Sequence, residues 1–207
     1  MRTLVIQAGG ESRRMGRDKA LVPFLGQPLI QRVLERLRHI ADEHIITTNH
    51  PANYRFLGLP LITDIFPGRG ALGGLYTALQ AARYPYVAIV ACDMPFANAQ
   101  LFKMMFEILE KSKADAVIPQ WQEGNEPFHA VYRKETSLPL VKEAIEEGYW
   151  RADAWYGSAN IRFLSAQEVM LVDPQGLTFR NVNTPEELAA AEELARQLDN
   201  DAPINNL

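Results

Sequence analysis

The sequence lacks most features of secreted, membrane and metal-cluster proteins. Its 207 residues include one cysteine, which excludes a disulfide framework and any cysteine-rich metal site and suits a reducing compartment. No apolar run approaches the ~18 residues of a transmembrane helix. The first residues lead directly into glycine, without the apolar core of a signal peptide. We therefore expect a cytoplasmic protein that does not interact with membranes.

Several catalytic motifs are also absent. There is no G-x-S-x-G around any serine, so a hydrolase triad lacks its nucleophile, and no H-E-x-x-H for a catalytic zinc. A G-x-G-x-x-G motif is missing, which removes the main support for a nicotinamide-dependent oxidoreductase. The P-loop pattern fails because five residues separate Gly10 from Gly16 and Lys19 comes three residues later.

The charge balance excludes a protein that coats nucleic acid. Acidic residues number 25 against 21 basic ones, a formal charge of −4, and 47% of the residues are apolar. This composition is that of an ordinary globular protein. The length predicts one domain spanning residues 1–207, with 199–207 as a flexible tail rich in Asn and Asp.

The first half of the chain alternates short β-branched runs with helical patterns. The amphipathic spacing of 28–40 predicts a helix, a glycine-rich turn opens a second that ends near Arg83, and Asn98 caps a third. Strands are predicted at 3–6, 44–48, 59–63, 86–91 and 114–119. This order predicts an α/β fold, Rossmann-like and doubly wound, with a mostly parallel sheet.

The second half breaks this alternation. Residues 128–133 follow a polar loop and predict a strand in an antiparallel insert or edge, and a helix then runs to Gly148. A strand is predicted at 169–172. Thr184-Pro-Glu-Glu187 forms a capping-box pattern with proline at the first helical position, which predicts a last helix to about Leu198.

The loop after the first strand has the character of a phosphate-binding loop. Glycines let the backbone approach a ligand, and successive free N–H groups make an anion-binding nest. Residues 11–19 contain four basic residues against two acidic ones in an otherwise acidic chain, namely Arg13, Arg14, Arg17 and Lys19 against Glu11 and Asp18. The alternative is a solvated basic turn without a ligand.

Two aspartates follow predicted strands. Asp64 and Asp93 lie 29 residues apart, close to the length of one β-α-β unit, so both carboxylates can lie on one rim of the sheet. Mg²⁺ in phosphate chemistry is held by one or two carboxylates together with substrate phosphates. Alternatively, each aspartate caps a helix or forms a turn, although Pro95 holds the backbone after Asp93 extended.

Other polar and aromatic residues have both a structural and a ligand-binding interpretation. The glycines of 68–74 can approach a nucleotide or pack a helix closely on the sheet, and Asn181 and Asn183 can bind a ligand or form a turn. For His129 and Cys92 we expect a structural role in or near the core. For Trp150 and Trp155, packing is favoured over stacking on a planar ligand.

The loop Ala8-Gly-Gly-x-Ser-Arg-Arg-Met-Gly-x-Asp-Lys19-Ala-Leu resembles the signature of nucleotidyltransferases that make molybdenum dinucleotide cofactors. The resemblance continues through Asp64, Gly70-Ala-Leu-Gly-Gly74, Cys92-Asp-Met-Pro-Phe96 and Asn181-Val-Asn-Thr-Pro-Glu-Glu-Leu188. These segments occur in the same order over almost the whole chain and are most similar to the molybdenum cofactor guanylyltransferase family. The resemblance implies a nucleotide-diphospho-sugar transferase-like fold.

The resemblance implies transfer of GMP from GTP to the terminal phosphate of Mo-molybdopterin with release of pyrophosphate. From the chemistry of the loop we expect the backbone N–H of Gly10 to join the nucleotide-binding nest, and Arg13 to join Lys19 and Asp93 as a catalytic residue. The resemblance itself implies Mg²⁺ at Asp93 and nucleotide binding by Gln7, Ala8, Gly9, Lys19, Thr47, Asn49, Asp64 and Asp93. It places the acceptor beside Asn181 and Asn183, and allows molybdoenzyme apoproteins or their chaperones as protein partners.

Two positions depart from the family pattern. Thr47 replaces the first asparagine of the Asn-x-Asn element on the guanine side, and Gln7 replaces a leucine. A cytidylyltransferase acting on the same pterin and a sugar-phosphate nucleotidyltransferase are therefore alternatives. From a different class, the alternative is a non-catalytic GTP-binding sensor or a chaperone for the cofactor.

Overall fold

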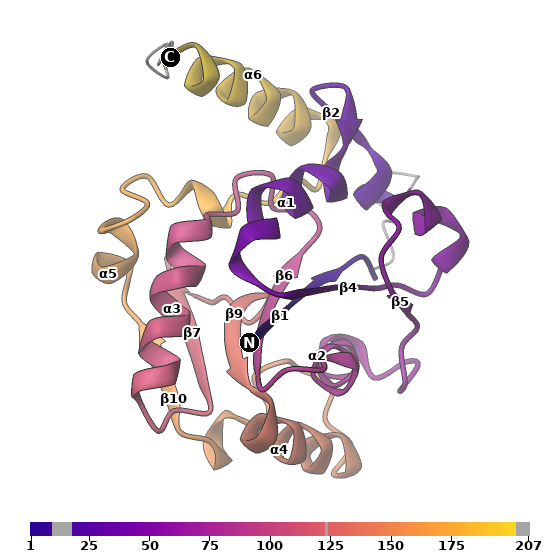
Figure 1. Ribbon diagram of the computed structural model, residues 1–207, viewed down its shortest axis with the longest axis vertical. Helices are drawn as coiled ribbons and strands as arrows, with labels where there is room; N and C mark the ends of the chain where they lie inside the picture. The colour runs from indigo at the N-terminus through magenta and orange to yellow at the C-terminus, as the bar shows by residue number, and fades with distance from the viewer. Residues whose placement is uncertain (10–17, 123, 202–207) are drawn as a thin grey trace.

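The computed structural model describes residues 1–9, 18–122 and 124–201, with side chains described as far as residue 198. Its centre is a twisted sheet in the order β10-β7-β9-β6-β1-β4-β5, with β8 pairing on the end of β7 (Figure 1). The strands are β1 (Arg2–Gln7), β4 (Glu43–Thr47), β5 (Leu61–Ile62), β6 (Tyr86–Ala91), β7 (Ala116–Trp121), β8 (Gly124–Asn125), β9 (His129–Arg133) and β10 (Ile161–Leu164). A hairpin, β2 (Pro23–Phe24) with β3 (Gln27–Pro28), stands outside this sheet.

Helices cover both faces of the sheet. The α-helices are α1 (Leu29–Leu37), α2 (Gly70–Ala81), α3 (Ala99–Lys111), α4 (Lys134–Glu146), α5 (Ala166–Met170) and α6 (Pro185–Asp201). Short 3-10 helices are η1 (Lys19–Leu21), η2 (Arg38–Ile40), η3 (Pro51–Leu57), η4 (Tyr156–Ser158) and η5 (Leu177–Phe179). Helices α1 and α3 lie on one face, and α2 and α4 lie on the other (Figure 1).

The alternation of side chains along the central strands builds the two layers. In β1, Leu4 and Ile6 pack into the core under α1 and α3, whereas Val5 packs under α2. Successive residues of β6 alternate in the same way. Because both faces are buried, these strands read in the sequence as nearly unbroken apolar runs. This confirms the predicted α/β fold.

Strand β9 runs antiparallel to both of its neighbours, and it lies inside the sheet. It pairs antiparallel with β6 on one side and with β7 on the other, whereas β1, β4, β5 and β6 are mutually parallel. The predicted antiparallel element is therefore an internal insert and not an edge. Consequently the segment just before His129 lies at the carboxyl end of β6.

The prediction of a strand at 169–172 is wrong, because this segment belongs to α5 and the turn after it. Ser165 accepts a hydrogen bond from the N–H of Glu168, and the Glu168 carboxylate accepts one from the N–H of Ser165, which starts α5 at Ala166. The actual strand is β10, whose side chains are mostly half-exposed, so no apolar run marked it. The other strands agree in place with the prediction, although β5 is reduced to Leu61–Ile62.

The two predicted helix caps, at Asn98 and Thr184, are both present, but the second has a different set of hydrogen-bond partners from the one predicted. The Asn98 side chain accepts from the N–H groups of Gln100 and Leu101, as expected. Thr184 accepts from the N–H of Glu187, but the Glu187 carboxylate accepts from the N–H of Asn183 and not from Thr184 itself. Helix α6 continues to Asp201, so residues 199–201 are helical and do not begin a tail.

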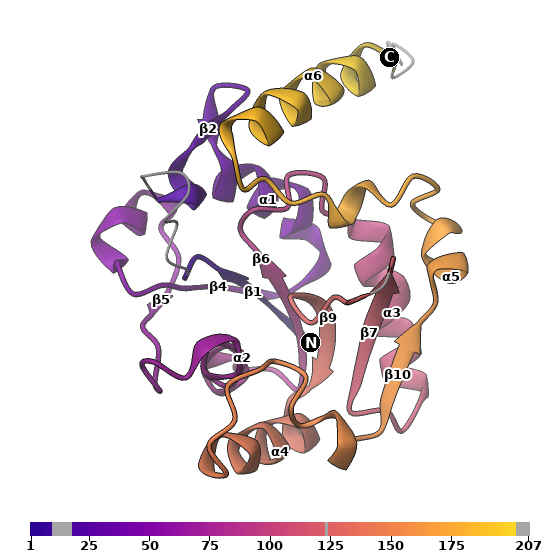
Figure 2. The same ribbon diagram turned by 180° about the vertical axis from the view of Figure 1, so that it is seen from behind.

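Helix α6 packs beside the N-terminal hairpin, far from its neighbours in sequence (Figure 2). A small apolar cluster joins Phe24 and Leu29 to Ala191 and Ala195, and Glu192 accepts a hydrogen bond from the N–H of Leu25. The C-terminal segment is thereby held against the N-terminal part of the chain.

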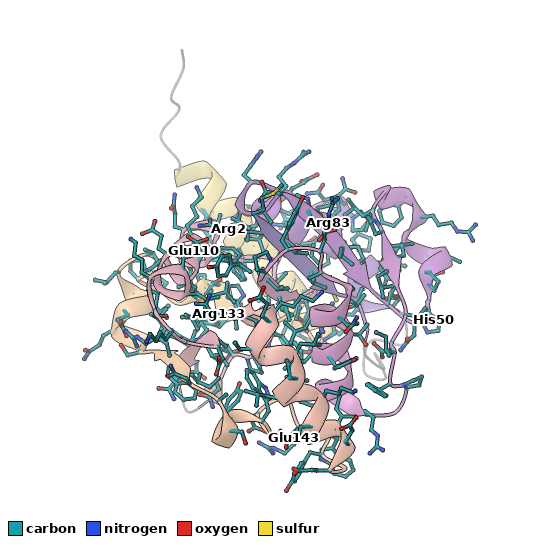
Figure 3. The ribbon with its side chains drawn as sticks, turned by 60° about the horizontal axis from the view of Figure 1, so that its bottom comes forward. Arg2, His50, Arg83, Glu110, Arg133 and Glu143 are labelled. Atoms are coloured by element: carbon teal, nitrogen blue, oxygen red, sulfur yellow. The ribbon has the colours of Figure 1, made fainter. Side chains whose placement is uncertain are left out.

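An ion pair lies at the surface near the amino-terminal end of β1, at the edge of the sheet opposite to the carboxyl ends of the strands. Arg2 and Glu110 lie side by side and form an ion pair (Figure 3).

Among the described residues, no helix is long and apolar enough to cross a membrane.

Gly176 is a position at which we predict a large loss of stability. Its φ is +62°, and a Cβ there would lie 1.8 Å from the Trp121 ring. We expect Gly176→Ala to lower the free energy of unfolding by about 2–4 kcal/mol, because the ring must move and the backbone becomes strained. Urea denaturation measures this change. Gly157→Ala is the control, since a Cβ at Gly157 meets no atom within 4 Å; an equal loss in both variants would contradict the prediction.

Candidate active site

The candidate site lies where the sheet reverses its strand order. From β1 the chain adds β4 and β5 on one side and then crosses to β6 on the other side. Ligands of open α/β sheets bind at the carboxyl ends of the strands at such a switch point. Gln7 ends β1 and Asp93 follows β6, and the Cys92 N–H donates to the Gln7 carbonyl (3.1 Å). The expected rim of the sheet is therefore the one that carries the predicted residues.

Lys19 is the centre of the site. Its Nζ donates to Asp93 Oδ2 (2.8 Å) and to Asn183 Oδ1 (2.6 Å), so one ammonium group joins three segments that are distant in the sequence. The side chains of Lys19 and Asp93 are 19% and 15% exposed. Partial burial strengthens the ion pair relative to one in water.

Asp93 retains an oxygen for a ligand. Its Oδ1 is buried and has no hydrogen-bond partner among the residues that the structure describes. A buried carboxylate oxygen without a donor is costly unless a cation or a donor from a ligand satisfies it. The donor chemistry fits Mg²⁺, which prefers oxygen ligands and completes its shell with water and phosphates. Within the described ranges no cluster of three or more His, Cys, Asp or Glu could hold a metal, so phosphates would supply further ligands.

Gln7, Ala8 and Gly9 lie at the end of β1, on the same rim of the sheet as Asp93. The Ala8 N–H donates to the Thr47 carbonyl (2.8 Å), which fixes the start of the loop against β4. Gln7 Nε2 is buried and without a partner in the described part of the chain, and its side chain faces Gly74 of α2. Gly9 is exposed, and a Cβ there would meet no atom within 4 Å. The predicted residues Gly10 and Arg13 lie outside the described residues.

Asn49 and Asp64 form a reciprocal pair beyond the ends of β4 and β5. Asn49 Nδ2 donates to Asp64 Oδ2 (2.9 Å), and the Asp64 N–H donates to Asn49 Oδ1 (3.1 Å). Thr47 is buried at the end of β4. His50, directly after Asn49, lies at the outer margin of the molecule (Figure 3). The structure thus brings Thr47, Asn49 and Asp64, all predicted to bind the nucleotide, to the carboxyl ends of β4 and β5.

The glycines of α2 have packing roles. A Cβ at Gly73 would lie 2.9 Å from the Phe66 carbonyl oxygen, and one at Gly70 would lie 3.3 Å from the Trp150 carbonyl oxygen. The structural interpretation therefore accounts for both glycines. Trp155 is buried in the core as expected, whereas Trp150 is 69% exposed.

The two asparagines before α6 are separated by the structure. Asn183 reaches Lys19, whereas Asn181 is exposed. The N–H of Val182, between them, donates to the Asp93 carbonyl (2.9 Å). The C-terminal segment is therefore tied directly to the backbone of the aspartate.

His129 has the predicted structural role and is completely buried. Its ring nitrogens contact Met94 Sδ (3.2 Å) and Thr178 Oγ1 (2.8 Å), and Phe102 and Phe179 pack against the ring. Burial lowers the pKa of His129 to about 3, so the ring is neutral. Cys92 is partly buried against the core, and desolvation raises the pKa of its thiol.

Glu126 is a site residue that sequence reasoning missed. The Ala91 N–H donates to the Phe128 carbonyl (2.9 Å), so the chain before Phe128 passes the carboxyl end of β6. Burial, and then the charge of Asp93, raise the pKa of Glu126 to about 7. Pro127 does restrict Glu126 to extended backbone, but only the position of β9 inside the sheet brings it to this rim.

The comparisons with known proteins identify the family of the chain. The family described as "MobA-like NTP transferase domain" matches residues 4–159. A molybdenum cofactor guanylyltransferase of Desulfosudis oleivorans is 36% identical over 191 residues, which cover 92% of this chain and 94% of that protein. A probable molybdenum cofactor guanylyltransferase of Peptoclostridium acidaminophilum is also 36% identical, over 89% of this chain and 85% of that protein.

Solved structures share the fold of this chain. The molybdopterin-guanine dinucleotide biosynthesis protein A of Archaeoglobus fulgidus has a TM-score of 0.81 at 25% identity, covering 94% of this chain and 99% of that chain. A 2-C-methyl-D-erythritol 4-phosphate cytidylyltransferase of Thermus thermophilus, at 17% identity and a TM-score of 0.69 over 93% of this chain and 98% of that chain, shares the fold. The chain belongs to the family of MobA-like nucleotidyltransferases.

Proposed function

We propose that this protein transfers GMP from GTP to the terminal phosphate of Mo-molybdopterin, forming the guanine dinucleotide of the cofactor and releasing pyrophosphate. The observation that carries the proposal is the Lys19–Asp93–Asn183 cluster at the switch point of the sheet. Support for this substrate pair comes from the relatives named molybdenum cofactor guanylyltransferase.

The reaction needs no nucleophile from the protein. A phosphate oxygen of the acceptor attacks the α-phosphorus of GTP, a new P–O bond forms, and the bond to the β-phosphate breaks with pyrophosphate leaving. Because the attacking oxygen is already anionic, the protein contributes positioning and neutralisation of charge. The absence of a serine-hydrolase elbow and of a catalytic zinc motif is consistent with this chemistry.

Each side of the cluster has a proposed role. Lys19 would bind the triphosphate, with the backbone N–H groups of Ala8, Gly9 and Gly10 as the anion-binding nest and Arg13 as a second cation. Asp93, through Oδ1, would hold Mg²⁺, which supplies positive charge at the phosphates when bound. Asn183 accepts a hydrogen bond from the Lys19 ammonium, so an acceptor bound beside Asn183 would have its phosphate next to the same cation.

The base would lie between Gln7 and the Asn49–Asp64 pair. Asp64 is held in place by Asn49, so its carboxylate is oriented before a nucleotide binds. A carboxylate that accepts from the N–H edge of guanine would favour GTP over CTP. Gln7, whose amide is buried without a partner among the described residues, would supply a further polar contact. The acceptor would approach from the Asn181 side.

Pyrophosphate release from GTP tests the proposal directly. The purified protein with Mg²⁺ and Mo-molybdopterin is offered GTP, CTP, ATP and dTTP in parallel, and we expect release with GTP. Release with CTP instead would support the cytidylyltransferase alternative. GTP binding in calorimetry without release from any nucleotide would contradict the proposal and support a sensor or cofactor chaperone.

We predict that Asp93→Asn lowers kcat on the order of 100-fold, because the variant loses the charge that holds the cation. The measurement is steady-state pyrophosphate release at saturating GTP. Asp42→Asn is the matched control: Asp42 accepts a hydrogen bond from the Arg2 N–H at the opposite edge of the sheet, so its turnover should be unchanged. Retention of more than about a tenth of the activity in Asp93→Asn would exclude the assigned role.

We predict that Lys19→Gln weakens GTP binding by about 10- to 100-fold, because it removes a partly buried charge that faces the phosphates. Isothermal titration calorimetry measures the dissociation constant. Lys111→Gln removes an exposed lysine paired with Glu107 and serves as the control. Equal affinity in the two variants would remove Lys19 from the nucleotide site.

Glu126 should make stability depend on pH. Its pKa is about 7 in the folded protein against a usual 4.5, so the folded state binds more protons between these values and wild-type stability falls as pH rises through this window. The free energy of unfolding of Glu126→Gln, measured relative to wild type, should therefore rise by about 1–2 kcal/mol from pH 5 to pH 8, a value that allows for solvent screening. Urea denaturation at the two pH values measures the difference.

The control for this prediction is Glu143→Gln, a carboxylate on the exposed side of α4 (Figure 3). Its stability relative to wild type should be the same at both pH values. A Glu126→Gln variant with the same flat profile would show that the pKa of Glu126 is not raised in the folded protein.

A further inference from the structure

The position of Lys19 depends on a very short element. Lys19 is the first residue of η1, a three-residue 3-10 helix. Within this turn, the Leu21 N–H donates to the Asp18 carbonyl (3.1 Å) and the Val22 N–H to the Lys19 carbonyl (3.2 Å). Because a three-residue helix has little stability of its own, contacts with other parts of the chain must fix the orientation of η1.

Asp18 supplies one such contact. One of its carboxylate oxygens accepts from the Ala20 N–H (3.2 Å), which caps η1. The other oxygen accepts a short hydrogen bond (2.6 Å) from the hydroxyl of Tyr54. Because Asp18 directly precedes Lys19, a contact that holds the Asp18 carboxylate also holds the backbone from which the lysine side chain extends.

Tyr54 is suited to hold Asp18 rigidly. Its side chain is completely buried in the core formed with α1 and α3, and it lies on η3, five residues after Asn49. Burial, and then the bond to Asp18, raise the pKa of Tyr54, so the phenol stays protonated and acts as a donor.

We infer that Tyr54 is a positioning residue for Lys19: its hydroxyl fixes Asp18, and with it the turn that carries the lysine, against the buried core. The inference rests on the proposed function, in which Lys19 binds the triphosphate. Tyr54 lies on η3, which follows the segment 47–49, so its hydrogen bond to Asp18 ties the turn of Lys19 to the chain just beyond the part of the site proposed to read the base. Tyr54 itself touches neither substrate.

The test is Tyr54→Phe, which deletes the hydroxyl and keeps the ring in the core. We expect kcat/KM for GTP and the GTP affinity from calorimetry each to fall about 10-fold, the size expected for losing a hydrogen bond to a charged group. The matched control is Tyr132→Phe. Tyr132 is also completely buried and donates a 2.6 Å hydrogen bond, to the Pro127 carbonyl, but it packs on the opposite face of the sheet.

Both variants should lose a similar amount of thermal stability, and only Tyr54→Phe should lose nucleotide affinity and turnover. A double-mutant cycle with Asp18→Ala, which removes both carboxylate oxygens, then tests the route. If Tyr54 acts through Asp18, the double variant should be no worse than Asp18→Ala alone within about twofold, whereas multiplying losses would contradict the inference. Unchanged kinetics and affinity in Tyr54→Phe would overturn it.

Failure of the inference is distinguishable from failure of the proposed function. If wild-type protein releases no pyrophosphate from any nucleotide, the proposed function fails, while GTP binding by Tyr54→Phe still tests the positioning role. If wild type is active and Tyr54→Phe matches it in both measurements, the proposed function stands and only the inference fails.

Discussion

The whole arrangement depends on one shared ammonium group. Lys19 follows the N-terminal loop, Asp93 lies beyond the central strand β6, and Asn183 precedes the last helix, yet all three meet at Nζ. A partly buried cation is stable only when acceptors surround it, so the lysine requires the other two segments to be in place. The hydrogen bond from the Val182 N–H to the Asp93 carbonyl and the packing of α6 on the β2–β3 hairpin hold these segments there.

In the proposed function, the same cluster would let one sheet serve two substrates. The residues proposed to bind the nucleotide follow β1, β4 and β5, whereas Asn183 comes from the C-terminal part of the chain and accepts a hydrogen bond from the same ammonium group. Two phosphates that must react with each other would then share a charge partner, which would reduce their repulsion as they approach. The acidic balance of the whole chain does not oppose this, because residues 11–19 contain four basic residues against two acidic ones.

Much of the site could be predicted because its residues lie at the ends of strongly patterned strands. Strand β6 is an unbroken apolar run, so its end at Ala91 placed Asp93 on the rim of the sheet. Where the pattern is weak the prediction failed. Strand β10 is half-exposed and has no apolar run, whereas the apolar residues at 169–172 suggest a strand although the capping box at Ser165 begins a helix there.

Local sequence determined the buried strands, the helix caps and the chemistry of the loop after β1, because apolar periodicity and hydrogen bonding between near neighbours act within a few residues. Only the tertiary structure decided the insertion of β9 between β6 and β7, which brings Glu126 to the site, and the contact of Tyr54 with Asp18 across 36 residues. Strand order and long-range hydrogen bonds depend on how whole layers pack. No short window of the sequence carries that information.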